Sequence, residues 1–363
     1  MKLLDWIVLC GTLLLIVLYG IYKSRKQKNI ESYLLGDKSL PWYQVMFGVM
    51  ATQASAVTFL SAPGQAYTDG MRFIQYYLGM PIAMIMVAAF FIPLYRKLNL
   101  YTAYQLLETK FDKKTRVLTA IFFLLQRGLA AGLTIYAPAL VLSSMLGWNL
   151  FITNLIMGGL VILYTVSGGT KAVAHTQMQQ MIVIIVGMFI AGYFIVALLP
   201  QEISFTDALH IAGSMDKLNT LETKFSLSDK YNIWSGIIGG FFLSLSYFGT
   251  DQSQVGRYIT GKSITQSRIG ILMNAIVKIP MQFLILLVGA LLFVFYQFHH
   301  SPIHFNNANV AIAESKNEQA HKNMQNTFYK LQDDKIKTSH ELSFVKKQNK
   351  ADAKKQKLEL LKK

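Results

Sequence analysis

Long apolar runs, separated by short polar loops, constrain the fold of this chain more than any other feature. The eight runs lie at about residues 3–22, 42–67, 73–95, 116–146, 150–166, 173–199, 232–249 and 267–298. About 20 apolar residues in a helix cross the hydrocarbon core of a bilayer, and a helix satisfies its own backbone hydrogen bonds there. The sequence therefore predicts an all-α polytopic membrane protein with eight transmembrane helices.

The composition agrees with this class and excludes others. Of the 363 residues, 53% are hydrophobic and 15% are charged, which is too apolar for a soluble domain of this size. The net charge of +16 does not indicate a nucleic-acid partner, because the basic residues lie between the apolar runs and in the tail. Cys10 is the only cysteine, so we expect neither a disulfide framework nor a cysteine metal site. The first run is too long for a signal peptide, which predicts a retained helix.

Charged loops predict the orientation in the membrane. Lys and Arg cluster after the first, third, fifth and seventh runs, whereas the alternate loops contain few of them. Positive charge marks the cytoplasmic side, so we expect an outside N-terminus and a location in the plasma (inner) membrane. Residues 299–363 form a polar, Lys-rich tail, for which we expect a flexible or partly helical segment on the outer side. Binding of this tail to an anionic surface is the alternative.

The stretch Met50–Tyr67 is the strongest candidate for a binding site. It begins as a membrane helix but carries five polar side chains within ten residues: Thr52, Gln53, Ser55, Thr58 and Ser61. Pro63 lacks an amide donor and Gly64 is flexible, so we expect the helix to open there. Opened carbonyls are hard ligands for a small cation, and such backbone survives in a bilayer only where it is covered. A kinked core helix is the simpler alternative.

A second interrupted helix indicates internal symmetry. The run at 232–249 contains Gly236, Gly239 and Gly240 and lies five helices after the run at 42–67. Interrupted helices at matching places in two halves are typical of inverted repeats with a binding site between them. We therefore expect four parts: an accessory helix at 1–30, a first five-helix repeat at 31–200, two helices of a second repeat at 201–298, and the tail at 299–363.

Several short motifs resemble those of the sodium/solute symporter family. They occur in the family's order and at the matching membrane positions: Tyr33-Leu34-Leu35-Gly36, Tyr136-Ala137-Pro138-Ala139-Leu140, and Gly249-Thr250-Asp251-Gln252 with Arg257-Tyr258. The residues are most similar to the branch of iodide, multivitamin and monocarboxylate carriers, and the family also includes sialic-acid symporters. The resemblance covers about residues 30–298. It implies a LeuT-like core, transport by alternating access, and sodium as the co-transported ion.

The resemblance also implies roles for individual residues. The family's main sodium site uses backbone carbonyls of core helix one, and the matching positions are Ala51 and Ala54. The family's substrate contacts on the same helix match Gln53, Ser55 and Thr58. Core helix eight, which supplies the hydroxyl ligands of that sodium site, has no counterpart here. We therefore expect the chain to be the N-terminal part of a longer carrier.

Three polar residues inside the runs need separate interpretation. Arg127 lies deep in the fourth run, where an arginine is costly and faces the bundle interior or a cavity. It suits a carboxylate, and sialic-acid symporters use an arginine at about this point for the substrate carboxylate, so we expect substrate binding, with structural pairing as the alternative. Lys278 is closer to the cytoplasmic end, and we expect it to snorkel. Gln177 replaces an aspartate that the family often carries, which predicts one sodium per solute.

These observations predict a sodium-coupled symporter that imports a small anionic organic solute, such as a carboxylate. Its partners would be that solute and the lipid bilayer, with no nucleic acid. A transporter-like membrane sensor and a proton-coupled carrier of the same fold are the alternatives. We do not expect an enzyme, because the runs are nearly free of the clustered Asp, Glu or His that membrane catalysis needs.

Overall fold

The computed structural model describes residues 3–24, 35–98, 100–226, 228–305 and 307–360, so Tyr33 and Leu34 of the first motif lie outside the described residues. Within the described ranges the chain is helical, without a β-strand, and Leu40 and Gly261 form an isolated parallel bridge. The longer helices are α1 (Leu3–Ser24), α3 (Trp42–Gln53), α4 (Ala56–Asp69), α8 (Lys113–Leu146), α9 (Leu150–Ala197), α10 (Phe205–Ser214), α11 (Gly240–Thr250), α13 (Ile264–Phe298), α14 (Asn307–Lys316) and α15 (Glu318–Leu360). The shorter helical segments are η1 (Gly36–Lys38), η2 (Met71–Tyr77), α5 (Met80–Met86), η3 (Val87–Phe91), α6 (Ile92–Lys97), α7 (Gln105–Lys110), η4 (Ser235–Gly239) and α12 (Gln252–Tyr258).

Several of the expected membrane spans form helices of suitable length. In the described part of the chain, four are long and apolar enough to cross a bilayer: Met71–Lys97, Lys113–Leu146, Val173–Ala197 and Ile264–Phe298. The bent pair of α3 and α4 makes a fifth. The run at 150–166 and most of the run at 173–199 lie within the single 48-residue helix α9, which ends at Ala197. The protein is therefore an integral membrane protein, whereas the number of eight spans stays a prediction.

The first interrupted helix opens at a different place from the one expected. Pro63 and Gly64 lie inside α4, so the predicted opening there is wrong. The chain instead leaves helical geometry at Ala54 and Ser55, and the two halves meet at 60°. An interior proline removes one helical hydrogen bond and crowds the carbonyl four residues earlier, but here α4 continues through it. Ser and Thr hydroxyls offer the backbone other partners, as the Thr58 hydroxyl does for Gln53 O. The polar side chains, rather than the proline, mark the interruption.

The second interrupted helix also bends beyond its glycines. Residues Ser235–Gly239 form one wide π-turn that continues into α11, and the chain turns at Asp251 before α12 begins. The glycines serve close packing instead. A Cβ on Gly236 would lie 2.6 Å from the carbonyl oxygen of Gln75, and one on Gly240 would lie 2.2 Å from that of Tyr76. The second interruption therefore lies at Asp251, beyond the run at 232–249, and not at the glycines where it was expected. The inverted repeat itself stays a prediction.

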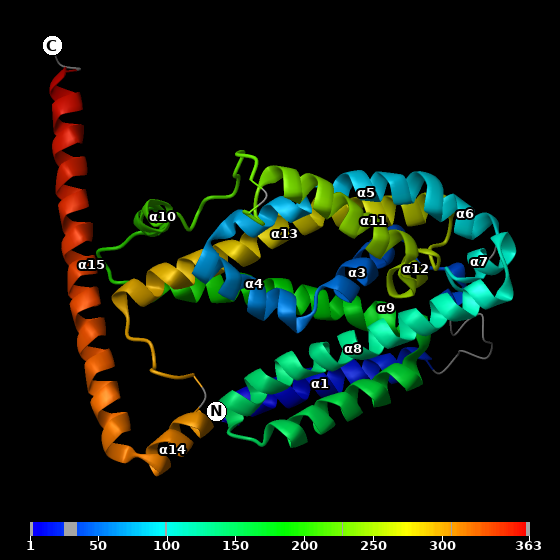
Figure 1. Ribbon diagram of the computed structural model, residues 1–363, viewed down its shortest axis with the longest axis horizontal. Helices are drawn as coiled ribbons and strands as arrows, with labels where there is room; N and C mark the ends of the chain where they lie inside the picture. The colour runs from blue at the N-terminus through cyan, green and yellow to red at the C-terminus, as the bar shows by residue number, and fades with distance from the viewer. Residues whose placement is uncertain (1–2, 25–34, 99, 227, 306, 361–363) are drawn as a thin grey trace.

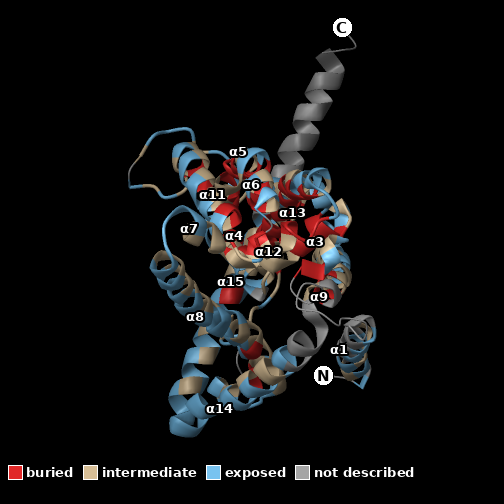
Figure 2. Cartoon of the chain, turned by 90° about the vertical axis from the view of Figure 1, so that its right-hand side faces the viewer, coloured by how far each residue is buried: buried red, intermediate tan, exposed pale blue. Residues whose placement is uncertain are grey.

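The core of the molecule surrounds α13. This helix packs against α3, α4 and α9 and contacts α5, η2 and α10 (Figure 1). Figure 2 shows that buried residues gather in this layer, while α1 and α8 are mostly exposed. Exposed side chains of α8 include Leu125, Leu129 and Leu133. Large apolar surfaces of this kind are suited to contact with lipid.

The tail folds into two helices, so most of it is helical. The long helix α15 crosses one end of the molecule, beside the C-terminal end of α13 (Figure 1). Lys335 donates to Tyr296 O, near the end of α13, at 2.6 Å, and Gln332 donates to Ser301 Oγ, in the segment that follows α13, at 2.6 Å.

We predict that Gly289→Ala weakens the packing of α13 on α4. The added Cβ would lie 2.1 Å from the carbonyl oxygen of Pro63, a backbone atom that cannot rotate away. Overpacking of this kind costs about 1–3 kcal/mol, so the Tm of the detergent-purified protein should fall. Gly64→Ala is the control, because its Cβ meets nothing within 4 Å among the described residues. Equal Tm values for the two variants would contradict the prediction.

Candidate functional site

The interruption between α3 and α4 redirects two backbone amides. In a continuous helix the amide of Ser55 would donate to the carbonyl of Ala51, and the amide of Thr58 to the carbonyl of Ala54. Here the Ser55 amide donates to Gln53 O at 3.0 Å, and the Thr58 amide donates to Ser55 O at 2.9 Å. The carbonyls of Ala51 and Ala54, which are the two predicted sodium ligands, therefore lose their regular helical donors.

The three predicted substrate contacts of this segment also lie at the interruption. Gln53 ends α3, Ser55 is extended in front of α4, and the Thr58 hydroxyl donates to Gln53 O at 3.2 Å. Gln53 lines a cavity of about 470 Å³, here called the Gln53 cavity, whose other walls come from η2, α5, α11 and α13. Thr58 lines a smaller cavity of about 190 Å³, here called the Thr58 cavity. Phe73 and Tyr77 line both cavities.

Arg127 lines neither of these two cavities. Its guanidinium forms an ion pair with Asp251, at the bend between α11 and α12, and donates to Ser253 Oγ at 2.6 Å. The Tyr247 ring, whose centroid lies 5.6 Å from Arg127 Cζ, lines the Gln53 cavity. Arg127 thus adjoins the cavity wall while its charge is engaged by a carboxylate. Its contact with a solute stays a prediction.

Asp251 is a residue of the site that sequence reasoning missed. It is 9% exposed, accepts from the Ser253 amide at 2.8 Å, and caps α12. The available signal was a lone carboxylate directly after the run at 232–249. A buried carboxylate needs a partner, and Arg127 is the described residue that supplies the opposite charge.

Lys278 differs most from its expected position. We predicted that it would snorkel toward the cytoplasmic end, and this is wrong, because its side chain is 1% exposed and lines the Gln53 cavity. On the same face of α13, Asn274 and Gln282 are 0% exposed, and both side-chain polar atoms of each have no hydrogen-bond partner among the described residues. Gln282 lines the Thr58 cavity. Spacing of four residues brings these three side chains onto one stripe.

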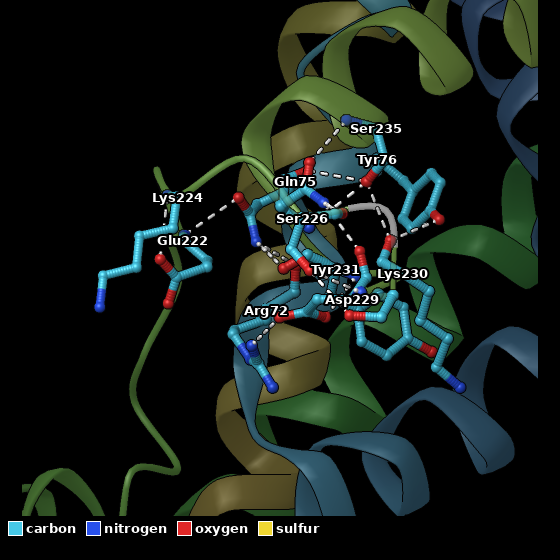
Figure 3. A network of polar contacts seen from close by, with 12 residues as sticks. Arg72, Gln75, Tyr76, Glu222, Lys224, Ser226, Asp229, Lys230, Tyr231 and Ser235 are labelled. Carbon is cyan, nitrogen blue, oxygen red and sulfur yellow. Dashed lines mark hydrogen bonds and ion pairs between the residues drawn. The ribbon is translucent and has the colours of Figure 1, made fainter.

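A folded loop covers the end of η2 that borders the two cavities (Figure 3). Arg72 Nη1 forms an ion pair with Asp229 at 2.8 Å, and Gln75 Nε2 donates to Tyr231 O at 3.0 Å. The Tyr76 hydroxyl donates to Lys230 O at 2.8 Å, and the Tyr76 ring lines the Gln53 cavity. The loop therefore holds a residue of the cavity wall in place.

Comparison with known proteins identifies the family. The family model described as "Sodium:solute symporter family" matches residues 33–328, which is most of the chain. This chain belongs to that family. The match begins just before α3 and continues into α15, so it includes both interrupted helices.

Individual relatives agree with this membership. The chain is 30% identical over 277 residues to sodium-coupled monocarboxylate transporter 1 of Xenopus laevis, covering 75% of this chain and 44% of the relative. It is 29% identical over 315 residues to the sodium/sialic acid symporter SiaT of Proteus mirabilis (strain HI4320), covering 85% and 62%. A solved Na⁺-coupled sialic acid symporter, in a substrate-bound outward-open state, matches with a TM-score of 0.76 and 27% identity, covering 85% of this chain and 65% of that chain. The chain thus spans about half to two thirds of the length of these proteins.

We predict that the pair of Arg127 and Asp251 stabilises the bend between α11 and α12. The side chains are 31% and 10% exposed, so Asp251→Asn should cost about 1–3 kcal/mol and lower the Tm of the purified protein. Arg127→Gln should have a similar effect, and the double variant should lose less than the sum of the two. Glu108→Gln is the control, because its pair with Arg116 is more exposed. Additive losses would show that the two charges do not act together.

We predict that acid loosens the loop over η2. The Tyr231 amide, and then the Arg72 guanidinium, hold the pKa of the Asp229 carboxyl below its ordinary value of 3.8. Its contribution to stability is therefore complete above this value and is lost as the pH falls further, through the lowered pKa. At neutral pH, Asp229→Asn should speed proteolytic cleavage of the loop, whereas Asp216→Asn in the preceding turn should not. Equal cleavage rates would contradict the role of Asp229.

Proposed function

We propose that the protein containing this chain is a sodium-coupled symporter that imports a small anionic organic solute across the plasma membrane by alternating access. The observation that carries this proposal is the opening at Ala54–Ser55, where two carbonyls lose their helical donors. Freed carbonyls suit a small hard cation, and interrupted helices build the ion and substrate sites of secondary transporters. The N-terminus lies outside in this proposal, as the charged loops predict.

The sodium ion would lie against the carbonyls of Ala51 and Ala54, and the solute against Gln53, Ser55 and Thr58. The Nε2 atom of Gln53 is buried and has no hydrogen-bond partner in the described part of the chain. An unpaired buried donor beside a cavity is available to a solute oxygen. Arg127 would join this site only if its guanidinium left Asp251.

The named relatives support the choice of solute class. They include a sodium-coupled monocarboxylate transporter and sodium/sialic acid symporters, whose substrates carry a carboxylate. Gln177, which is neutral at a position where the family often carries a carboxylate, supports a stoichiometry of one sodium per solute. The LeuT-like core is likewise a proposal, and the bends at Ala54–Ser55 and Asp251 support it.

We expect uptake by the complete carrier that contains this chain, reconstituted in proteoliposomes, to require an inward sodium gradient and to persist when an uncoupler collapses the proton gradient. Thr58→Val should raise the sodium concentration for half-maximal uptake about tenfold, because its hydroxyl helps to hold the opened backbone at Gln53. Thr68→Val is the matched control on the same helix, since Thr68 is exposed. Uptake that follows only the proton gradient would contradict sodium coupling.

A further inference from the structure

Arg127 and Lys278 are cationic side chains within apolar helices of the site, and their surroundings are opposite. The Arg127 guanidinium meets Asp251 and Ser253. For Lys278, no ion pair or hydrogen bond joins its ammonium group to any of the described residues, although the side chain is 1% exposed. A buried charge without a counter-ion is costly, and the cost is relieved when an anion binds next to it.

The cavity around Lys278 has the size and the mixed polar and aromatic lining of a small-molecule binding site. Lys278 lines the Gln53 cavity, whose volume of about 470 Å³ falls within the usual range for small-molecule sites. Gln53 and Ser244 supply two further polar side chains to its wall. The rest of the wall is apolar or aromatic, from Phe73, Tyr76, Tyr77, Met80, Leu243, Tyr247 and Phe248.

We propose that Lys278 is the residue that binds the charged group of the solute, and that Arg127 positions the bend at Asp251 instead. This inference rests on the proposed function and deepens it. Lys278 would pair with one anionic group, Gln53 would donate its unpaired Nε2 to the same group or its neighbour, and the aromatic wall would enclose an apolar or ring-shaped body. The cavity therefore selects small organic monoanions over neutral molecules of the same shape.

The position of Lys278 also predicts how solute and cation are coupled. Gln53 lies between Ala51 and Ala54 in the chain, so the cavity containing Lys278 adjoins the proposed sodium ligands. The ammonium group repels a sodium ion until an anion neutralises it. Anion and sodium should therefore each raise the affinity for the other by the same factor.

The first test uses phenylacetate and the neutral phenylacetamide as probes that share one shape. In potassium buffer, phenylacetate should raise the Tm of the purified protein, and phenylacetamide should not. Lys278→Met should raise the Tm without a probe, because it removes an uncompensated buried charge, and should reduce the apparent affinity for phenylacetate at least tenfold. Lys278→Arg, which keeps the charge, should restore part of the response. Lys262→Met, at an exposed lysine, is the matched control.

Several results would overturn the proposal. These are an equal response to both probes, an unchanged phenylacetate affinity in Lys278→Met, or a loss of that affinity in Arg127→Gln but not in Lys278→Met. A lowered Tm of Lys278→Met with unchanged probe selectivity would show a purely structural lysine.

A sodium titration separates this inference from the proposed function. With phenylacetate present, the wild-type protein should respond to sodium at concentrations at least fivefold lower than without it, and Lys278→Met should lose this difference. If sodium has no effect on any form of the protein while the anion response still depends on Lys278, the proposed coupling fails and the anion site stands. If uptake is sodium-dependent but indifferent to Lys278, the anion site fails and the coupling stands.

Discussion

Backbone hydrogen bonding inside a bilayer is the constraint on which the rest of this structure depends. A membrane helix can open only where protein covers the freed groups or where they line a water-filled cavity. Here the opening at Ala54–Ser55 is possible because α13 packs along both α3 and α4. Gly289 permits that contact, since its missing side chain leaves room for the backbone at Pro63. The packing of α13 against α3 and α4 therefore covers the opened backbone and places the cavity beside it.

The distribution of charge follows from the same constraint. At the second bend, Asp251 caps α12 and would be an unpaired buried carboxylate without Arg127. The arginine predicted to meet a solute is thus engaged in holding a bend. Lys278 has no such partner in the described part of the chain, and it lies in the cavity beside the first bend. Arg127 is neutralised by a carboxylate of the protein, whereas Lys278 faces the cavity without one among the residues described. This difference is the basis of the proposed anion site.

The surface loop and the tail have a supporting role. The network of Arg72, Gln75 and Asp229 fixes η2, whose aromatic side chains line both the Gln53 cavity and the Thr58 cavity. The helix α15 is held to the end of α13 through Gln332 and Lys335. Both features hold the ends of helices that line the cavities.

The sequence by itself determined the helical membrane class, the family, and the segment at which the first helix is interrupted. These properties follow from local patterns: apolar length, the charge of short loops, and the polar side chains from Thr52 to Ser61. The sequence did not determine the point of opening, which lies at Ala54–Ser55 and not at Pro63-Gly64. At Ala54–Ser55 the Thr58 hydroxyl gives the backbone a partner, whereas α4 continues through Pro63. Only the tertiary structure decided that Arg127 has a carboxylate partner and that Lys278 faces a cavity without one among the described residues. Arg127 meets Asp251 across 124 residues and Lys278 meets a cavity formed by four other segments, and contacts over such separations leave no local pattern in the sequence.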